Sequence, residues 1–262
     1  MKKILVLLIA VSMAFALAAC ASHEETGSES IKVETTNDSG ERALTEVDES
    51  VGEYEAELFE GDLYLVKYNG ASKNVVVPSV YNGKPVYGID TKCFKDNTTI
   101  EKIEFSSGIE WIAGRALMGC SNLKEAILPE DMEEIPNEMF RDCESLINVV
   151  MPNNVADAGR ATFYGCKSLK AIEFKNATFT KLDMNFAMKS GIETFTVPNS
   201  VQEISTFVFM GCENLKEVHI PESVQYIYEG AFNGSENVTV YAPKGSFAET
   251  YAAQEHLNFI AE

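Results

Sequence analysis

The sequence is poor in the residues and motifs that enzymes use. It contains three histidines, His23, His219 and His256, which are too scattered to assemble a zinc site or a histidine-based triad. It has no phosphate-binding loop, no G-x-S-x-G turn and no calcium loop. We therefore expect a protein that is not an enzyme and that uses no cofactor or metal. A hydrolase is the least favoured alternative, and a deep cleft with two or more carboxylates would revive it.

Basic residues are also scarce. The chain carries 21 Lys and Arg against 40 Asp and Glu, a formal net charge of −19. Such a charge repels the phosphates of nucleic acids, so we expect no nucleic-acid partner.

No apolar run is long enough for the roughly 20 residues that span a bilayer. The run from Ile4 to Leu17 follows two lysines, which predicts a signal peptide over residues 1–19. Leu17-Ala18-Ala19-Cys20 resembles a bacterial lipobox, which implies a lipid on Cys20 and attachment to the membrane through it. The alternative is ordinary signal cleavage with Cys20 incidental. Residues 20–50, rich in Ser, Thr, Glu and Asp, predict an acidic disordered tether, so the expected location is the bacterial cell envelope, outside the cytoplasm.

What the sequence does contain is a repeat of 23 residues. Apolar residues recur at this spacing in several columns. One column holds Ile100, Leu123, Leu146, Leu169, Ile192, Leu215 and Val238; a second holds Phe94, Leu117, Phe140, Phe163, Phe186, Phe209 and Phe232; a third holds Val86, Ile109, Met132, Val155, Thr178, Val201 and Val224. A constant phase in several columns predicts a solenoid.

Each unit begins L-x-x-I-x-I, whose alternation predicts a strand with one buried face. A proline then closes the strand, and the A-F-x-G-C stretch predicts a tight helical or turn segment. One unit buries too little apolar surface to fold alone, so units must stack. The expected fold is a mostly β solenoid with parallel strands stacked in a ladder and short helical or turn segments.

Two places depart from the pattern. In the unit from Leu169 to Ser190, Lys175 replaces the proline, Lys189 replaces the cysteine and Leu182 comes one residue late, so we expect a distorted unit. An insertion over residues 81–85 predicts a surface hairpin or loop around Asn82-Gly83.

The repeat resembles the leucine-rich repeat proteins, and within them the BspA-like branch, whose unit reads I-P-x-x-V-x-x-I-x-x-x-A-F-x-x-C-x-x-L. The resemblance covers roughly residues 54–262. We expect a solenoid over residues 51–262 with capping units at 51–99 and 238–262. The resemblance implies adhesion-type binding to a protein or glycan, and an envelope scaffold that binds another bacterial component is the alternative.

Four cysteines share one column: Cys120, Cys143, Cys166 and Cys212. Stacked units place them in a line, which does not suit a tetrahedral metal site. A disulfide between neighbours is sterically possible. We favour buried free thiols.

Candidate binding residues lie among the outward positions. Ile127, Ile147 and Val150 place apolar side chains on the open face of the long strands, which suggests the centre of a partner site. Alternatively, the end of the array or the tether covers them, or they are simply tolerated. Trp111 and Tyr226 point outward on the opposite strip. They are five units apart and cannot share one small site, so isolated exposed aromatics are the favoured interpretation, with Trp111 kept as a candidate contact.

Overall fold

The computed structural model describes residues 35–36, 42–43 and 52–262. The chain divides into two compact units, Met1–Thr45 and Glu46–Glu262. In the first, β1 (Thr35–Thr36) pairs antiparallel with β2 (Arg42–Ala43). The expected signal peptide, Cys20 and most of the expected tether lie outside the described residues. Among the residues that are described, no helix has the length and apolarity to cross a membrane.

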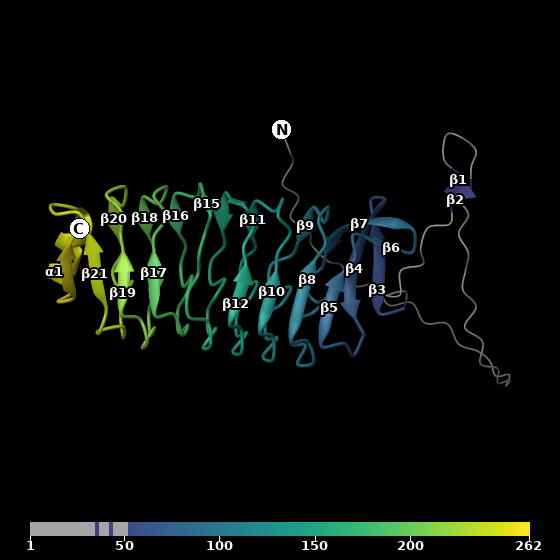
Figure 1. Cartoon of the computed structure of the whole chain (residues 1–262), viewed down its shortest axis with the longest axis horizontal. Helices are drawn as coiled ribbons and strands as arrows, with labels where there is room; N and C mark the ends of the chain where they lie inside the picture. The colour runs from purple at the N-terminus through teal and green to yellow at the C-terminus, as the bar shows by residue number, and fades with distance from the viewer. Residues whose placement is uncertain (1–34, 37–41, 44–51) are drawn as a thin grey trace, which may run out of the picture. The chain divides into compact units, whose positions relative to one another are not determined.

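The second unit is a parallel β-solenoid, which confirms the predicted fold class (Figure 1). Its long strands form two four-stranded sheets with the orders β5-β8-β10-β12 and β17-β19-β21-β22. The strands are β5 (Asn74–Val77), β8 (Lys102–Phe105), β10 (Glu125–Ile127), β12 (Asn148–Val150), β17 (Thr194–Thr196), β19 (Glu217–His219), β21 (Thr239–Ala242) and β22 (Asn258–Ala261). Ala126 lies opposite Ile103 on one side and Val149 on the other, so the ladder register follows the 23-residue period.

Shorter strands form further strips of the solenoid. They are β9 (Trp111–Ile112), β11 (Glu134–Ile135), β13 (Asn154–Val155), β14 (Asp157–Ala158), β15 (Asn176–Ala177), β16 (Lys181–Leu182), β18 (Glu203–Ile204) and β20 (Tyr226–Ile227). β11 pairs with β14, β13 with β15, and β18 with both β16 and β20, all in parallel. The V-x-x-I half of each unit therefore builds a ladder of its own.

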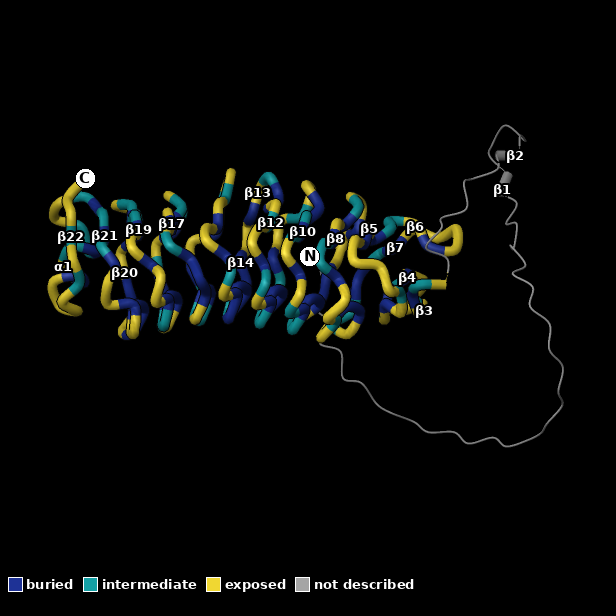
Figure 2. Tube along the Cα trace, turned by 60° about the horizontal axis from the view of Figure 1, so that its bottom comes forward, coloured by how far each residue is buried: buried dark blue, intermediate teal, exposed yellow. Residues whose placement is uncertain are grey.

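The core runs along the solenoid between these strips (Figure 2). Every member of the predicted phenylalanine and leucine columns is at most 3 % exposed. The rings of Phe140 and Phe163 stack at 5.6 Å between centroids, and those of Phe209 and Phe232 at 5.2 Å. In both pairs the ring of one unit covers the ring of the next, which is why one unit needs its neighbours to bury its apolar surface.

Turns connect the strips, as predicted. Two positions of the turns recur in the left-handed conformation, one shared by Arg115, Glu138, Ala161, Asn185 and Phe207, the other by Asp96, Gly119, Asp142, Gly165, Lys189 and Gly211. Left-handed residues reverse the chain and prevent a helix from propagating. The one α-helix of the described chain is α1 (Phe247–Gln254), where the Ser246 side chain accepts a hydrogen bond from the Glu249 N–H.

The solenoid opens with an antiparallel pair, β3 (Tyr54–Phe59) and β4 (Asp62–Tyr68), and β4 runs parallel to β7 (Lys84–Ile89). β6 (Val80–Tyr81) pairs antiparallel with β7. Asn82 and Gly83 join β6 to β7 with φ values of 50° and 72°, the conformation of a two-residue hairpin turn. The predicted insertion is therefore a hairpin.

The unit from Leu169 to Ser190 is distorted, as expected, and the column prediction is wrong there in two details. Val155 lies opposite Ala177 rather than Thr178. The place of the cysteine is taken by Ser190 rather than Lys189, because the Ser190 N–H bonds to the Ala187 oxygen as the Cys166 N–H bonds to that of Phe163. The chain enters the next strip one residue early at Ala177, and two residues gained before β16 then place Leu182 one residue late, opposite Ile204.

Candidate functional site

The open face of the long strands carries a ladder of alternating charges. Glu101 lies between Lys73 and Lys124, with carboxylate oxygens 2.6 Å from both Nζ atoms. Glu193 lies between Lys170 and Lys216 at 2.9 and 3.0 Å. These lysines lower the pKa of both carboxyls to about 2, chiefly through their hydrogen bonds. Lys170, Glu193 and Lys216 thus alternate in sign and pair across successive turns.

An apolar patch interrupts this ladder. Ile147 follows Lys124 and precedes Lys170 in the same column, so the alternation of charges is interrupted at Ile147. Its side chain is 57 % exposed, and Val150 in the neighbouring column is 41 % exposed. Val150 lies opposite Ile127, which is half-buried. Ile127, Ile147 and Val150 are hereafter the apolar patch. Neither end of the solenoid covers Ile147 or Val150. The alternative that the end of the array covers them is therefore wrong.

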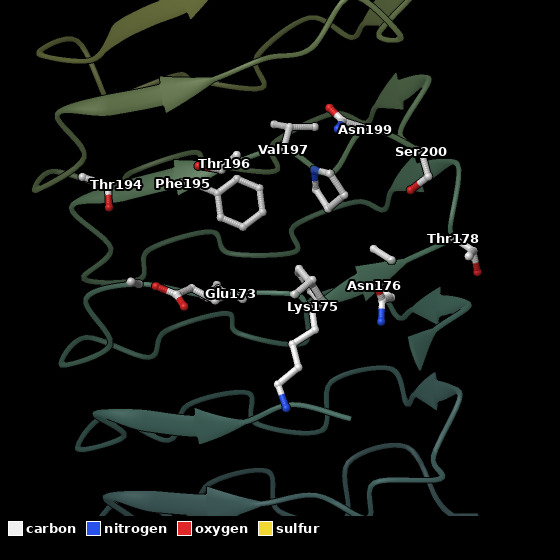
Figure 3. A pocket seen from close by; sticks show the side chains of 15 residues that line it. Glu173, Lys175, Asn176, Thr178, Thr194, Phe195, Thr196, Val197, Asn199 and Ser200 are labelled. Carbon is white, nitrogen blue, oxygen red and sulfur yellow. The ribbon is translucent and has the colours of Figure 1, made fainter. Parts of the chain in front are cut away.

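A hollow lies beyond the patch, where the ladder of long strands breaks. β12 ends one four-stranded sheet and β17 begins the other, and residues 171–174 between them form no strand. The hollow has a volume of about 630 Å³ and is lined by residues 171–178 and 194–200 (Figure 3). Within the described chain, no backbone hydrogen bond joins residues 171–175 to β17. One edge of β17 therefore opens into the hollow with unpaired backbone groups.

The walls of the hollow are mixed in character. Phe195 and Val197 come from the β17 side, and Glu173 is the one carboxylate of the lining. Lys175 points away from the hollow toward the preceding turn (Figure 3), where its Nζ donates to the Asn153 Oδ1 at 3.0 Å. The lysine that replaces the proline thus ties the irregular unit to its neighbour. The apolar patch and the irregular unit lie on adjacent turns.

Trp111 is not part of this surface. It lies on β9, in the sheet with β7, and is 45 % exposed. Its ring contacts Tyr64 at 5.8 Å, and Tyr64 contacts Tyr87 at 5.4 Å and Phe59 at 6.4 Å. The interpretation of Trp111 as an isolated aromatic is therefore wrong. Phe59 and Tyr64 belong to the antiparallel opening pair, which has no counterpart in the repeat, so the period gave no sign of the cluster.

Tyr226 lies in a second aromatic group. Its ring contacts that of Tyr228 at 4.6 Å and stacks on Phe247 of α1 at 5.5 Å. It is not isolated either, because the closing helix provides a partner from outside the repeat.

The column cysteines are free and buried, as favoured from the sequence. The thiols of Cys120, Cys143 and Cys166 each donate to a carbonyl oxygen of the preceding turn at 3.1 Å. Burial raises the pKa of Cys120 to about 12 and raises those of the other thiols as well. Within residues 52–262, no three His, Cys, Asp or Glu side chains converge as metal ligands would.

The solenoid stacks parallel strands in a ladder, and each of its turns is one short repeat unit with an apolar core. Tight turns rather than long helices connect the strips. This architecture is that of a leucine-rich repeat solenoid. The model of the BspA type leucine rich repeat region matches residues 70–186 and 180–252 in six copies, and the chain belongs to this family.

One solved structure agrees on the fold. A leucine-rich repeat protein of T. pallidum is 22 % identical, with a TM-score of 0.55 over 83 % of this chain and 98 % of that one. A leucine rich cell surface protein of Faecalibacterium prausnitzii is 18 % identical, with a TM-score of 0.38 over 72 % of this chain and 74 % of its own. No functionally curated protein matches the chain. The first structure supports the fold and nothing beyond it.

Proposed function

We propose that the chain is a lipid-anchored binding protein of the bacterial cell envelope that engages a protein or glycan through the apolar patch and the adjoining hollow. Residues 1–19 serve as the signal peptide, Cys20 carries the lipid, residues 20–50 form the tether and residues 51–262 form the binding domain. Membership of the BspA-type family supports an adhesion-type role.

The observation that carries the proposal is the exposed apolar patch next to the break between the two sheets of long strands. Elsewhere in the column of Ile147 the side chains are charged and paired with their neighbours, whereas Ile147 itself is open to solvent. An apolar side chain there contributes nothing to the pairing of the sheet face and is stabilised only when a partner covers it. The open edge of β17 adds hydrogen-bonding groups beside it, as extended ligands require.

The experiment is a binding assay against purified host matrix proteins and a cell-wall extract. Ile147→Glu and Val150→Glu place a charge in the patch and should each abolish capture of the true ligand. Val76→Glu is the matched control, because Val76 is 61 % exposed and lies in the same column as Val150, on β5. Capture that survives both patch variants, or that is lost equally in the control, would show that the patch is not the site.

The lipid anchor has its own test. Cys20→Ala should move the protein from the detergent phase to the aqueous phase, and unchanged partitioning would contradict the anchor. Protease added to intact cells separates the two envelope roles, because an adhesion-type protein is cleaved at the surface and an internal scaffold is protected.

A candidate place for the hydrolase alternative is a hollow of about 330 Å³ between β4, β7 and the chain before β9. Asp62 and Glu110 line it, but its lining contains no histidine, serine or cysteine. We propose a binding role because this lining offers no side-chain nucleophile next to a histidine base.

A further inference from the structure

Three arginines gather around one buried carboxylate in the turns that follow β9, β11 and β14. Glu138 is 5 % exposed and accepts two hydrogen bonds from Arg115, Nε to Oε2 at 3.1 Å and Nη2 to Oε1 at 3.0 Å. Arg141 donates from Nη1 to Oε2 at 3.1 Å, and the Nη2 of Arg160 lies 3.7 Å from Oε1. The sequence contains only one further arginine, Arg42. Arg115, Arg141 and Arg160 are hereafter the arginine cluster.

The carboxylate holds the arginines in place. The hydrogen bonds from Arg115 lower the pKa of Glu138, against the opposing effect of its burial. Glu138 therefore stays ionised at neutral pH and fixes guanidinium groups that would otherwise move freely on long side chains.

The cluster carries more positive charge than Glu138 neutralises. Asp142 adds a second carboxylate, with Oδ2 3.4 Å from the Nε of Arg141. The Arg141 guanidinium lies 4.6 Å from the centre of the Tyr164 ring, and the Nζ of Lys189 lies 5.9 Å from it. Three guanidinium groups thus meet two carboxylates, a local excess of positive charge on a chain whose net charge is −19.

Two of the arginines present this charge to solvent. The side chains of Arg115 and Arg160 are 49 % and 59 % exposed, and both reach the same oxygen of Glu138. Guanidinium groups bind oxyanions through paired N–H donors, so one oxyanion can bridge the N–H groups that Glu138 leaves free. A long polyanion is disfavoured, because the acidic chain around the cluster repels it.

From this geometry we propose that the arginine cluster is a binding site for a single sulfate or phosphate group, either free or carried on a ligand of low charge. Glu138 acts as a positioning residue, and Arg115 and Arg160 contact the anion. The site stands apart from the apolar patch and does not depend on the proposed function.

The test titrates the full chain in chloride buffer with sodium sulfate, sodium phosphate, glucose 6-sulfate and glucose, using calorimetry. We expect one saturable site for the anions and none for glucose. Arg160→Gln should weaken binding about tenfold, the loss of one charge-assisted contact. Arg160→Lys keeps the charge but loses the paired N–H donors of the guanidinium group. Its anion affinity should lie between those of the wild type and of Arg160→Gln.

Lys216→Gln is the matched control, because it removes one positive charge from the open face of the long strands. Anion affinity should be unchanged in this variant. Equal affinities for sulfate and glucose 6-sulfate assign the site to a free anion, and tighter binding of the sugar ester assigns it to a group on a glycan.

The proposal is overturned if no anion binds saturably, if Arg160→Gln binds as the wild type does, or if Lys216→Gln loses as much. Should Arg160→Gln fail to fold, Arg160→Lys decides by the same comparison.

Discussion

Ile127 and Val150 lie opposite each other in the parallel register of β10 and β12, and the two differ in burial: Ile127 is half-buried and Val150 is exposed. An exposed aliphatic side chain adds little to folding, whereas a half-buried one shields the sheet. We therefore expect Val150→Thr and Ile147→Thr to change the free energy of unfolding by no more than about 0.5 kcal/mol. Chemical denaturation measures this. A larger loss would mean that these residues are part of the core, and the patch would lose its functional meaning.

The stacked phenylalanines should dominate stability. Phe140 is fully buried and stacks on Phe163, so Phe140→Ala leaves a cavity in the middle of the array and should cost about 3 to 5 kcal/mol. Denaturant unfolding followed by circular dichroism gives the value. Leu58→Ala, at a residue that is 55 % exposed, is the control and should cost far less. Equal losses in the two variants would contradict the stacked core.

The core could be predicted from the sequence because a solenoid repeats its packing. A column such as that of Leu123 and Leu146 keeps one environment in every turn, so its period is visible in the letters alone. The prediction for Thr178 failed because one residue is lost before β15 and two are gained before β16, and a fixed period does not show a loss that is followed by a gain. The hollow beside β17 lies at the same irregular unit, and the repeat gave no sign of it.

Residues outside the repeat explain the rest of what was missed. Tyr64 and Phe247 reach the exposed rings of Trp111 and Tyr226 from the ends of the array. The arginine cluster was missed because Arg115 and Glu138 occupy the same turn position in successive units, and a single sequence does not reveal that this position places their side chains in contact.

Acid should weaken the charge ladder. The pKa of Glu101 is held near 2, below the ordinary value of 4.5, so its contribution to stability is complete above about pH 4.5 and is lost as the pH falls toward 2. Glu101→Gln should remove this part of the pH dependence of the melting temperature. Because the pairs are solvent-exposed, 1 M salt should shrink the difference between the two proteins. A difference in melting temperature that grows on acidification, or that salt leaves unchanged, would contradict the stabilising role of the charge pairs.

The buried thiols should be inert in the native state. Burial holds the pKa of Cys120 near 12, and only the thiolate is reactive. In a Cys20→Ala background, iodoacetamide at pH 8 should modify none of the five cysteines of the solenoid before unfolding and all five in denaturant. Mass spectrometry counts the adducts. Rapid native labelling of Cys143 or Cys166 would contradict the packed turns.

The central claim is that the apolar patch and the adjoining hollow form the binding surface. Hydrogen exchange with and without a captured ligand tests this claim most directly. We predict slowed exchange in β12 and along the open edge of β17, over residues 148–150 and 194–196, with no change in β8 or β21. Protection confined to other strands, or spread evenly along the array, would contradict the account.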